Sequence, residues 1–199
     1  MDNSRPTWAE IDLTAIKHNL RTIRDAAGKA GVMAVVKANA YGHGVLEVSR
    51  ACQEEGIDYF GVASLQEALE LKEAQLEAPV LVLGYIPERF AAATIRAGVR
   101  PCVFTLESAQ AFSEAALGMG SKARVHIKVD TGMGRLGFAV NEESLDQITA
   151  ISRLKGIEME GIFTHFSEAD AEEDIFTRKQ LRQFSALIAE LENRGINIP

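Results

Sequence analysis

The stretch MAVVKANAYGHG, from Met33 to Gly44, changes character halfway along. Its first part is a short apolar run of the kind found in strands buried on both faces, and Lys37 stands where that run ends. An ammonium group in this position loses contact with water, which disfavours its charged form and makes a nucleophilic amine available near neutral pH. The position equally suits a lysine whose ammonium group extends from the strand end into solvent.

Similar apolar runs recur along the chain, and amphipathic helical patterns fill the gaps between them. The predicted strands are MAVVKA (33–38), YFGVAS (59–64), PVLVLG (79–84), RPCVFT (100–105), RVHIKVD (124–130) and MEGIFTHF (159–166). Ser64 and Asn141 are predicted N-caps, and Glu67 completes a capping box with Ser64. About six βα units follow, which favours either a (β/α)8 barrel or a doubly wound sheet.

Composition excludes several classes of protein. The chain has 199 residues and a formal net charge of −7, and its Lys and Arg residues are scattered, so a nucleic-acid surface is not expected. No apolar signal core and no membrane-spanning run occur. Cys52 and Cys102 show no motif spacing, which favours a reducing compartment, and we expect a cytoplasmic protein.

Longer blocks carry a family resemblance. The string AVVKANAYGHG resembles the cofactor-lysine signature of alanine racemases, which are barrel-type pyridoxal phosphate (PLP) enzymes. WAEIDLTAIKHNL, VLVLGY, VHIKVDTGMGRLGF and GIFTHFSEAD are similar to further blocks of that family, in the same order. The resemblance implies a TIM-type (β/α)8 barrel, of which about six βα units are present. It also implies interconversion of L- and D-alanine, D-alanine supply for peptidoglycan, and a homodimer.

The resemblance also implies roles for individual residues. Lys37 would be the catalytic residue, as aldimine lysine and as base, and Arg135 would bind substrate beside the cofactor. Lys128 would brace that arginine, often as a carboxylated lysine in the family; the alternative is an ion pair with Asp130. The remaining cofactor-binding residues would be Val35, Tyr41, Leu83 and His165, and no metal is expected.

Other patterns have weaker interpretations. TGMGRLG, through Gly132, Gly134 and Gly137, matches the GxGxxG motif of nicotinamide-binding proteins, but Phe138 to Val140 stand between it and the next helix. His43 and His126 have no second ligand at metal spacing. Apart from the capping by Glu67, the carboxylates of Glu67, Glu70, Glu172 and Glu173 are most simply interpreted as parts of solvated helix faces.

Domain organisation follows from the ends of the chain. Residues 1–12, containing part of WAEIDL, are predicted to be a lead-in strand that pairs with a C-terminal β-domain absent here, and residues 13–199 an incomplete barrel domain. A second base, a tyrosine in the family, would then lie elsewhere, and residues 1–199 alone are expected to racemise alanine poorly. The alternatives are a serine or broad-specificity racemase, and a PLP-binding barrel without turnover.

Overall fold

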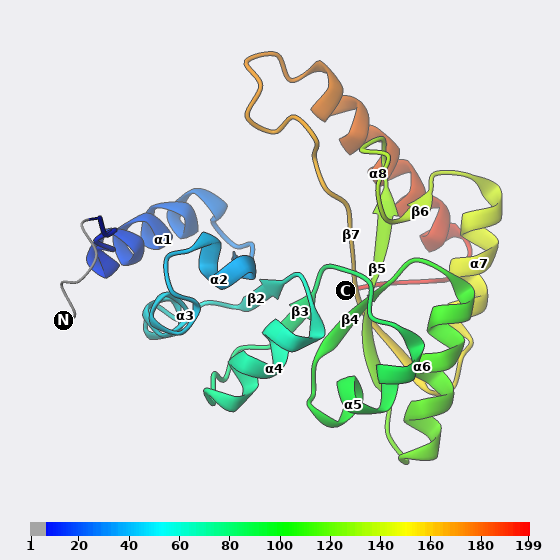
Figure 1. The fold of residues 1–199 in the computed structure, drawn as a ribbon. Coiled ribbons are helices and arrows are strands. Elements are labelled where there is room, and N and C mark those ends of the chain that lie inside the picture. The colour runs from blue at the N-terminus through cyan, green and yellow to red at the C-terminus, as the bar shows by residue number, and fades with distance from the viewer. Residues whose placement is uncertain (1–6) are drawn as a thin grey trace.

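A computed structural model describes residues 7–199 as an α/β fold around one parallel sheet (Figure 1). The strands are β1 (Met33–Val35), β2 (Tyr59–Val62), β3 (Val80–Val82), β4 (Arg100–Val103), β5 (Ala123–Asp130), β6 (Phe138–Ala139) and β7 (Ile157–Phe163). The helices are α1 (Leu13–Ala27), α2 (Lys37–Tyr41), α3 (Val45–Glu54), α4 (Leu65–Glu73), the 3₁₀ turn η1 (Glu88–Phe90), α5 (Ala91–Arg96), α6 (Leu106–Gly118), α7 (Glu142–Ser152) and α8 (Ile175–Asn193).

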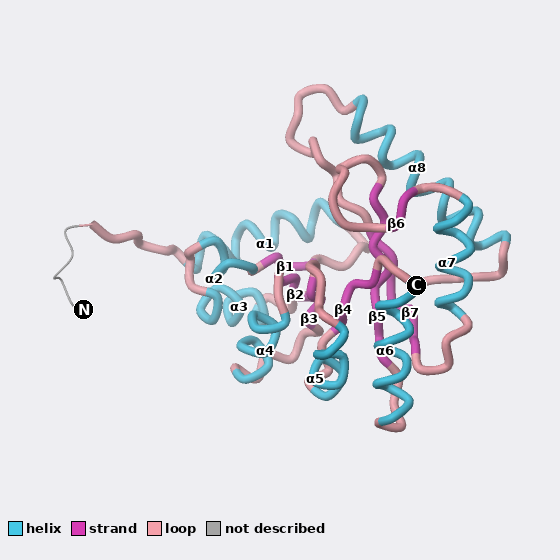
Figure 2. Tube along the Cα trace, turned by 45° about the vertical axis from the view of Figure 1, so that its right-hand side comes forward, coloured by secondary structure: helices cyan, strands magenta, loops and turns pink. Residues whose placement is uncertain are grey.

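The six predicted strands form a continuous parallel row in the order β1-β2-β3-β4-β5-β7. The short β6, which the sequence did not predict, pairs with the last two residues of β5. Figure 2 shows the strands in a row, with α3, α4, α5 and α6 beside it in the order of the strands they follow. Within residues 7–199, β1 pairs only with β2 and β7 only with β5. The fold is therefore part of a (β/α)8 barrel, and the prediction of that class is confirmed.

The two faces of the row have different character because side chains alternate along each strand. Toward the helices lie fully buried apolar side chains: Phe60, Val62, Val80, Val82, Val103, Val125, Ile127 and Val129 are 0% exposed. Each such side chain contributes roughly 1.5–3 kcal/mol through removal from water. The inner face carries a mixture of apolar and polar side chains, among them Val35, Leu83 and Lys128. At Gly61 a Cβ would lie 2.9 Å from the Met33 sulfur and 3.3 Å from Leu83, so a larger residue there would require these side chains to shift.

Local capping matches the sequence patterns. Ser64 and Glu67 form the predicted capping box at α4, and the Asn141 side chain accepts from the Ser144 backbone at α7. At the N-terminus, residues 8–12 form no strand, and the Asp12 side chain caps α1, which begins at Leu13. Of the predicted lead-in strand, residues 1–6 lie outside the described residues. Its pairing with a second sheet stays a prediction. No helix in residues 7–199 has both the length and the apolar character needed to cross a membrane.

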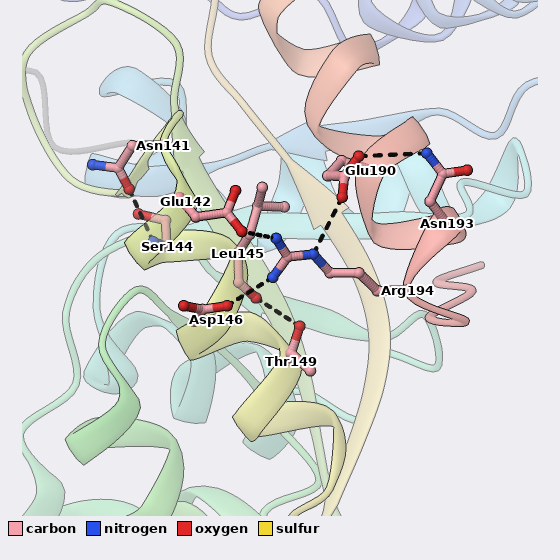
Figure 3. A network of polar contacts seen from close by, with 9 residues as sticks. All are labelled: Asn141, Glu142, Ser144, Leu145, Asp146, Thr149, Glu190, Asn193 and Arg194. Atoms are coloured by element: carbon pink, nitrogen blue, oxygen red, sulfur yellow. Dashed lines mark hydrogen bonds and ion pairs between the residues drawn. The ribbon is translucent and has the colours of Figure 1, made fainter.

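An ion-pair network fixes the end of α8 against α7 (Figure 3). The guanidinium of Arg194 contacts the carboxylates of Glu142, Asp146 (2.8 Å) and Glu190 (3.4 Å). Beneath it, Leu187 and Leu191 are each only 2% exposed. This anchoring matters for the site, because the other end of α8 reaches the loops beyond β5 and β7.

Candidate active site

A cavity of about 310 Å³ opens at the C-terminal ends of the strands, where the functional groups of barrel enzymes gather. All seven predicted site residues line it: Val35, Lys37, Tyr41, Leu83, Lys128, Arg135 and His165. Ala63, Gly84, Leu136 and Phe163 complete the lining. Residues from five separate strands or strand exits thus meet in one place, although their individual roles stay predictions.

Lys37 lies at the exit of the strand, as the sequence predicted, although the strand itself is shorter than the predicted run 33–38. β1 ends at Val35, and the residues from Ala38 to Tyr41 form a left-handed turn with φ between 50° and 56°. Residues other than glycine rarely adopt this conformation, which costs roughly 1 kcal/mol or more for each residue. The turn brings Tyr41 back beside the lysine, and the Lys37 ammonium nitrogen lies 5.9 Å from the centre of the Tyr41 ring.

Glu67 holds this turn from outside, so its prediction as a solvated helix-face residue is wrong. One oxygen of its carboxylate accepts from the Ala38 backbone N–H at 2.7 Å, and the other accepts from Ala63 at 2.7 Å and Ser64 at 3.2 Å. The sequence predicted that Glu67 caps its own helix, but it did not predict the contact with Ala38, which lies in the preceding βα unit.

Lys128 projects from β5 into the cavity and is only 5% exposed. Its ammonium group donates to the carbonyl of Val129 at 2.7 Å and lies 5.4 Å from the centre of the Phe163 ring. Burial lowers the pKa of Lys128, and the nearby Arg135 lowers it further, against an opposing effect of Asp130. Within residues 7–199 no carboxylate lies within ion-pair distance of Lys128, so the alternative of a Lys128–Asp130 pair is not formed.

The glycine-rich loop after β5 folds around Asp130. Its carboxylate accepts from the backbone N–H groups of Gly132 (2.9 Å), Gly134 (3.1 Å) and Arg135 (2.8 Å). Gly137 passes so close to β5 that a Cβ there would lie 2.4 Å from the Asp130 nitrogen. These contacts place Arg135 on the cavity wall, and Asp130 is a supporting residue that the predicted site omitted.

The same loop excludes the nicotinamide alternative for TGMGRLG. A dinucleotide-binding motif needs a helix that opens directly on its glycines, so that the helix N-terminus can hold the pyrophosphate. Here the strand β6 follows the glycines, and α7 begins only at Glu142.

His165 lies just beyond β7, at the exposed rim of the cavity. Burial lowers its pKa, and the positive charges of Arg135, Lys128 and Lys37 lower it further. Its imidazole is therefore held in the neutral form at pH 7. A role at the pyridine nitrogen through an arginine, which the resemblance implies, stays a prediction.

The lining as a whole fits an anionic, planar ligand that reacts with an amine. Lys37, Lys128 and Arg135 supply positive charge, and within the described residues no Asp or Glu lines the cavity. Leu83 and Phe163 offer apolar surface for a ring, and Tyr41 offers a hydroxyl group. Within residues 7–199 there is no group of three or more His, Cys, Asp or Glu side chains that could hold a metal ion. The residues present thus fit PLP, with Lys37 and Lys128 as the two available amines.

Comparisons with known proteins show which family the chain resembles. The family model described as alanine racemase, N-terminal domain, matches residues 11–199. An alanine racemase of Clostridium perfringens is 45% identical over 195 residues, which cover 98% of this chain and 50% of that protein. A solved alanine racemase of Clostridium difficile 630, in complex with cycloserine, has a TM-score of 0.94 at 38% identity, covering 98% of this chain and 54% of that one.

A second enzyme shares the fold at greater distance. A histidine racemase of Leuconostoc mesenteroides has a TM-score of 0.82 at 31% identity, covering 87% of this chain and 46% of that one. The chain spans about half the length of the curated relatives it matches. Because the family model covers nearly the whole sequence and the identity extends along it, the chain belongs to the alanine racemase family.

Proposed function

We propose that the chain provides the cofactor-binding part of a PLP-dependent racemase that interconverts L- and D-alanine. The observation that carries the proposal is the cavity that joins Lys37, Lys128 and Arg135 with no carboxylate among its described lining residues. Such a site suits both the phosphate of the cofactor and the carboxylate of an amino acid. The membership of the chain in the alanine racemase family supports the same activity.

When bound, PLP supplies an electron sink for the negative charge left on Cα after proton removal. Lys37, which lines the cavity beside Tyr41, would hold the cofactor through its amine and would move the proton at Cα. Tyr41 would orient the cofactor phosphate with its hydroxyl group. Val35 and Leu83 would exclude water from the cofactor, and Arg135 would orient the substrate.

Exchange of both enantiomers needs a second base on the opposite face, which this proposal places outside residues 1–199. A homodimer would provide it from the partner subunit. Supply of D-alanine for peptidoglycan and a cytoplasmic location complete the proposal; Cys52 and Cys102 are both buried free thiols, which suits a reducing compartment.

The amino acid is the least constrained part of the proposal, because a histidine racemase shares the fold. The test incubates the full-length protein and PLP in D₂O with enantiopure alanine, serine or histidine. NMR follows deuteration at Cα, and circular dichroism follows the ratio of the two enantiomers. We expect alanine to exchange and racemise fastest. Faster turnover of serine or histidine would reassign the substrate, and bound PLP with no exchange of any amino acid would favour a PLP-binding protein without turnover.

A further inference from the structure

Gln180 is a fully buried polar residue of α8 that the proposed mechanism does not use. Its side chain is 0% exposed, and both ends of its amide are hydrogen bonded. The amide oxygen accepts from the Ser167 backbone N–H (3.0 Å) and from the Ser167 hydroxyl group (3.3 Å). The amide nitrogen donates to the Thr131 hydroxyl oxygen (3.1 Å) and to the His165 carbonyl (3.0 Å).

The partners fix the orientation of this amide. The Ser167 backbone N–H can only donate and the His165 carbonyl can only accept, so the oxygen and nitrogen of Gln180 cannot exchange places. Thr131 accepts a hydrogen bond from Gln180, and its hydroxyl oxygen also lies 2.8 Å from that of Thr164, where either hydroxyl can donate. A single network therefore runs from the exit of β7 through α8 to the loop after β5 and back to β7.

The two loops joined in this way carry functional groups of the cavity. Thr131 directly follows Asp130, the residue around which the Arg135 loop folds. His165 itself lines the cavity, and its carbonyl is one of the partners of Gln180. Phe176, one turn before Gln180, packs on the same loop, since a Cβ on Gly132 would lie 3.0 Å from its ring.

We propose that Gln180 is a positioning residue that sets the relative placement of the Arg135 loop and His165. The inference rests on the proposed function in treating this cavity as the cofactor site. An amide suits the task because it can accept at one loop and donate to the other at the same time. No residue of similar shape but without hydrogen-bonding groups can hold both loops, and each partner left unsatisfied would shift toward water.

A general loss of stability would follow from many core substitutions, so the test needs a local readout. The pKa of His165 provides such a readout, because it depends on the burial of the imidazole and on the distances from the imidazole to the charged groups of Arg135, Lys128 and Lys37. The full-length protein is labelled at histidine, and the pKa of His165, assigned with His165→Gln, is measured by NMR in wild type and in Gln180→Met. Gln183→Met is the matched control: it lies on the same helix, and its amide oxygen is buried without a hydrogen-bond partner in the described structure.

In Gln180→Met we expect the pKa of His165 to rise toward its ordinary value of about 6.5. Turnover of alanine should fall about 10- to 100-fold, as for small misplacements of reacting groups. Gln183→Met should leave both quantities as in wild type. An unchanged or lower pKa in a folded Gln180→Met variant, or the same change in both variants, would overturn the proposal.

A second variant keeps the test decisive if Gln180→Met does not fold. Thr131→Val is nearly isosteric and removes the Thr131 hydroxyl, and with it the contact between the Gln180 amide and the loop after β5 and the contact with Thr164. The same rise in the pKa of His165 should occur with a smaller size, and no rise would overturn the proposal. The NMR measurement needs no turnover. A protein that fails to racemise alanine would therefore refute the proposed function without deciding the role of Gln180.

Discussion

The Glu67 carboxylate accepts a hydrogen bond of 2.7 Å from the Ala38 backbone N–H, across 29 positions of sequence. The contact joins the start of α4 to the left-handed turn that follows Lys37. That turn is unfavourable for residues with side chains and persists only where surrounding contacts hold it. The same carboxylate also accepts from Ala63, so one charged group fixes the exits of β1 and β2 together.

Replacement of Glu67 by Gln should therefore destabilise the protein and loosen Lys37. A glutamine has only one oxygen, so at least one of the two N–H groups, on Ala38 or Ala63, loses its acceptor, at a cost of about 1–3 kcal/mol in the free energy of unfolding. Urea unfolding measures this cost. Glu70→Gln, at an exposed position of the same helix, is the control and should stay near wild type; equal stabilities of the two variants would contradict the role of Glu67.

Lys37 should be the lysine that bonds covalently to the cofactor. Sodium borohydride reduction of the PLP-bound protein, followed by peptide mapping, should place the pyridoxyl group on Lys37. Lys128 is the internal competitor, because it is the other amine of the cavity. Lys37→Arg keeps the positive charge but removes the primary amine, and it should abolish both the label and turnover. A label on Lys128 in wild type would contradict the assignment.

Much of this fold was predictable because its signals are local. Buried strands appear as short apolar runs, and the capping box at Ser64 and the cap at Asn141 are defined within four residues. The positions of Lys37 and His165 at strand exits were predictable for a related reason, since parallel strands bring all their C-terminal ends to one edge of the sheet.

The remaining features depend on contacts between distant segments. The left-handed turn after Lys37 depends on Glu67, which belongs to the next βα unit. The two-residue β6 exists only because the Asp130 loop folds back on β5. Gln180 reads in the sequence as one polar residue of an amphipathic helix, and nothing near it indicates that α8 buries it between two loops.

Lys128 should react reversibly with carbon dioxide. Burial lowers its pKa, so a larger fraction of the amine is neutral than for an exposed lysine. The neutral amine would form a bond to the carbon of CO₂ and release one proton, giving a carbamate beside Arg135. In ¹³CO₂-equilibrated protein, a carbamate signal should appear in the ¹³C NMR spectrum and disappear in Lys128→Ala.

The same modification has a functional consequence. Lys128→Ala should lower turnover, and a small carboxylate or halide should restore part of it by standing beside Arg135. Lys155→Ala, at an exposed lysine, should have neither effect. Wild-type turnover in Lys128→Ala would rule out the bracing role.

Asp130 should make the stability of the protein depend on pH in the acid range. Burial by itself raises the pKa of Asp130, but the N–H groups of Gly132, Gly134 and Arg135 outweigh it and hold the pKa below its ordinary value. A lowered pKa in the folded state means that the stabilisation is fully present above the unfolded value of about 3.9 and is lost as pH falls through the folded value. Asp130→Asn keeps one acceptor oxygen but removes the charge. Its free energy of unfolding should be lower than that of wild type by about 1 kcal/mol at pH 7, a small difference because Asp130 is partly exposed to solvent.

The difference between wild type and Asp130→Asn should therefore be constant from pH 7 to about pH 5 and shrink as the pH falls below about 4, where the carboxyl group of the unfolded chain takes up a proton. Urea unfolding at each pH measures it. Asp170→Asn, at an exposed aspartate of the loop after β7, should show no such dependence. Because the same N–H groups shape the loop that carries Arg135, Asp130→Asn should also weaken binding of the cofactor or substrate at pH 7. A stability difference that persists unchanged to pH 3 would show that the asparagine disturbs packing, and that the charge of Asp130 does not hold the loop.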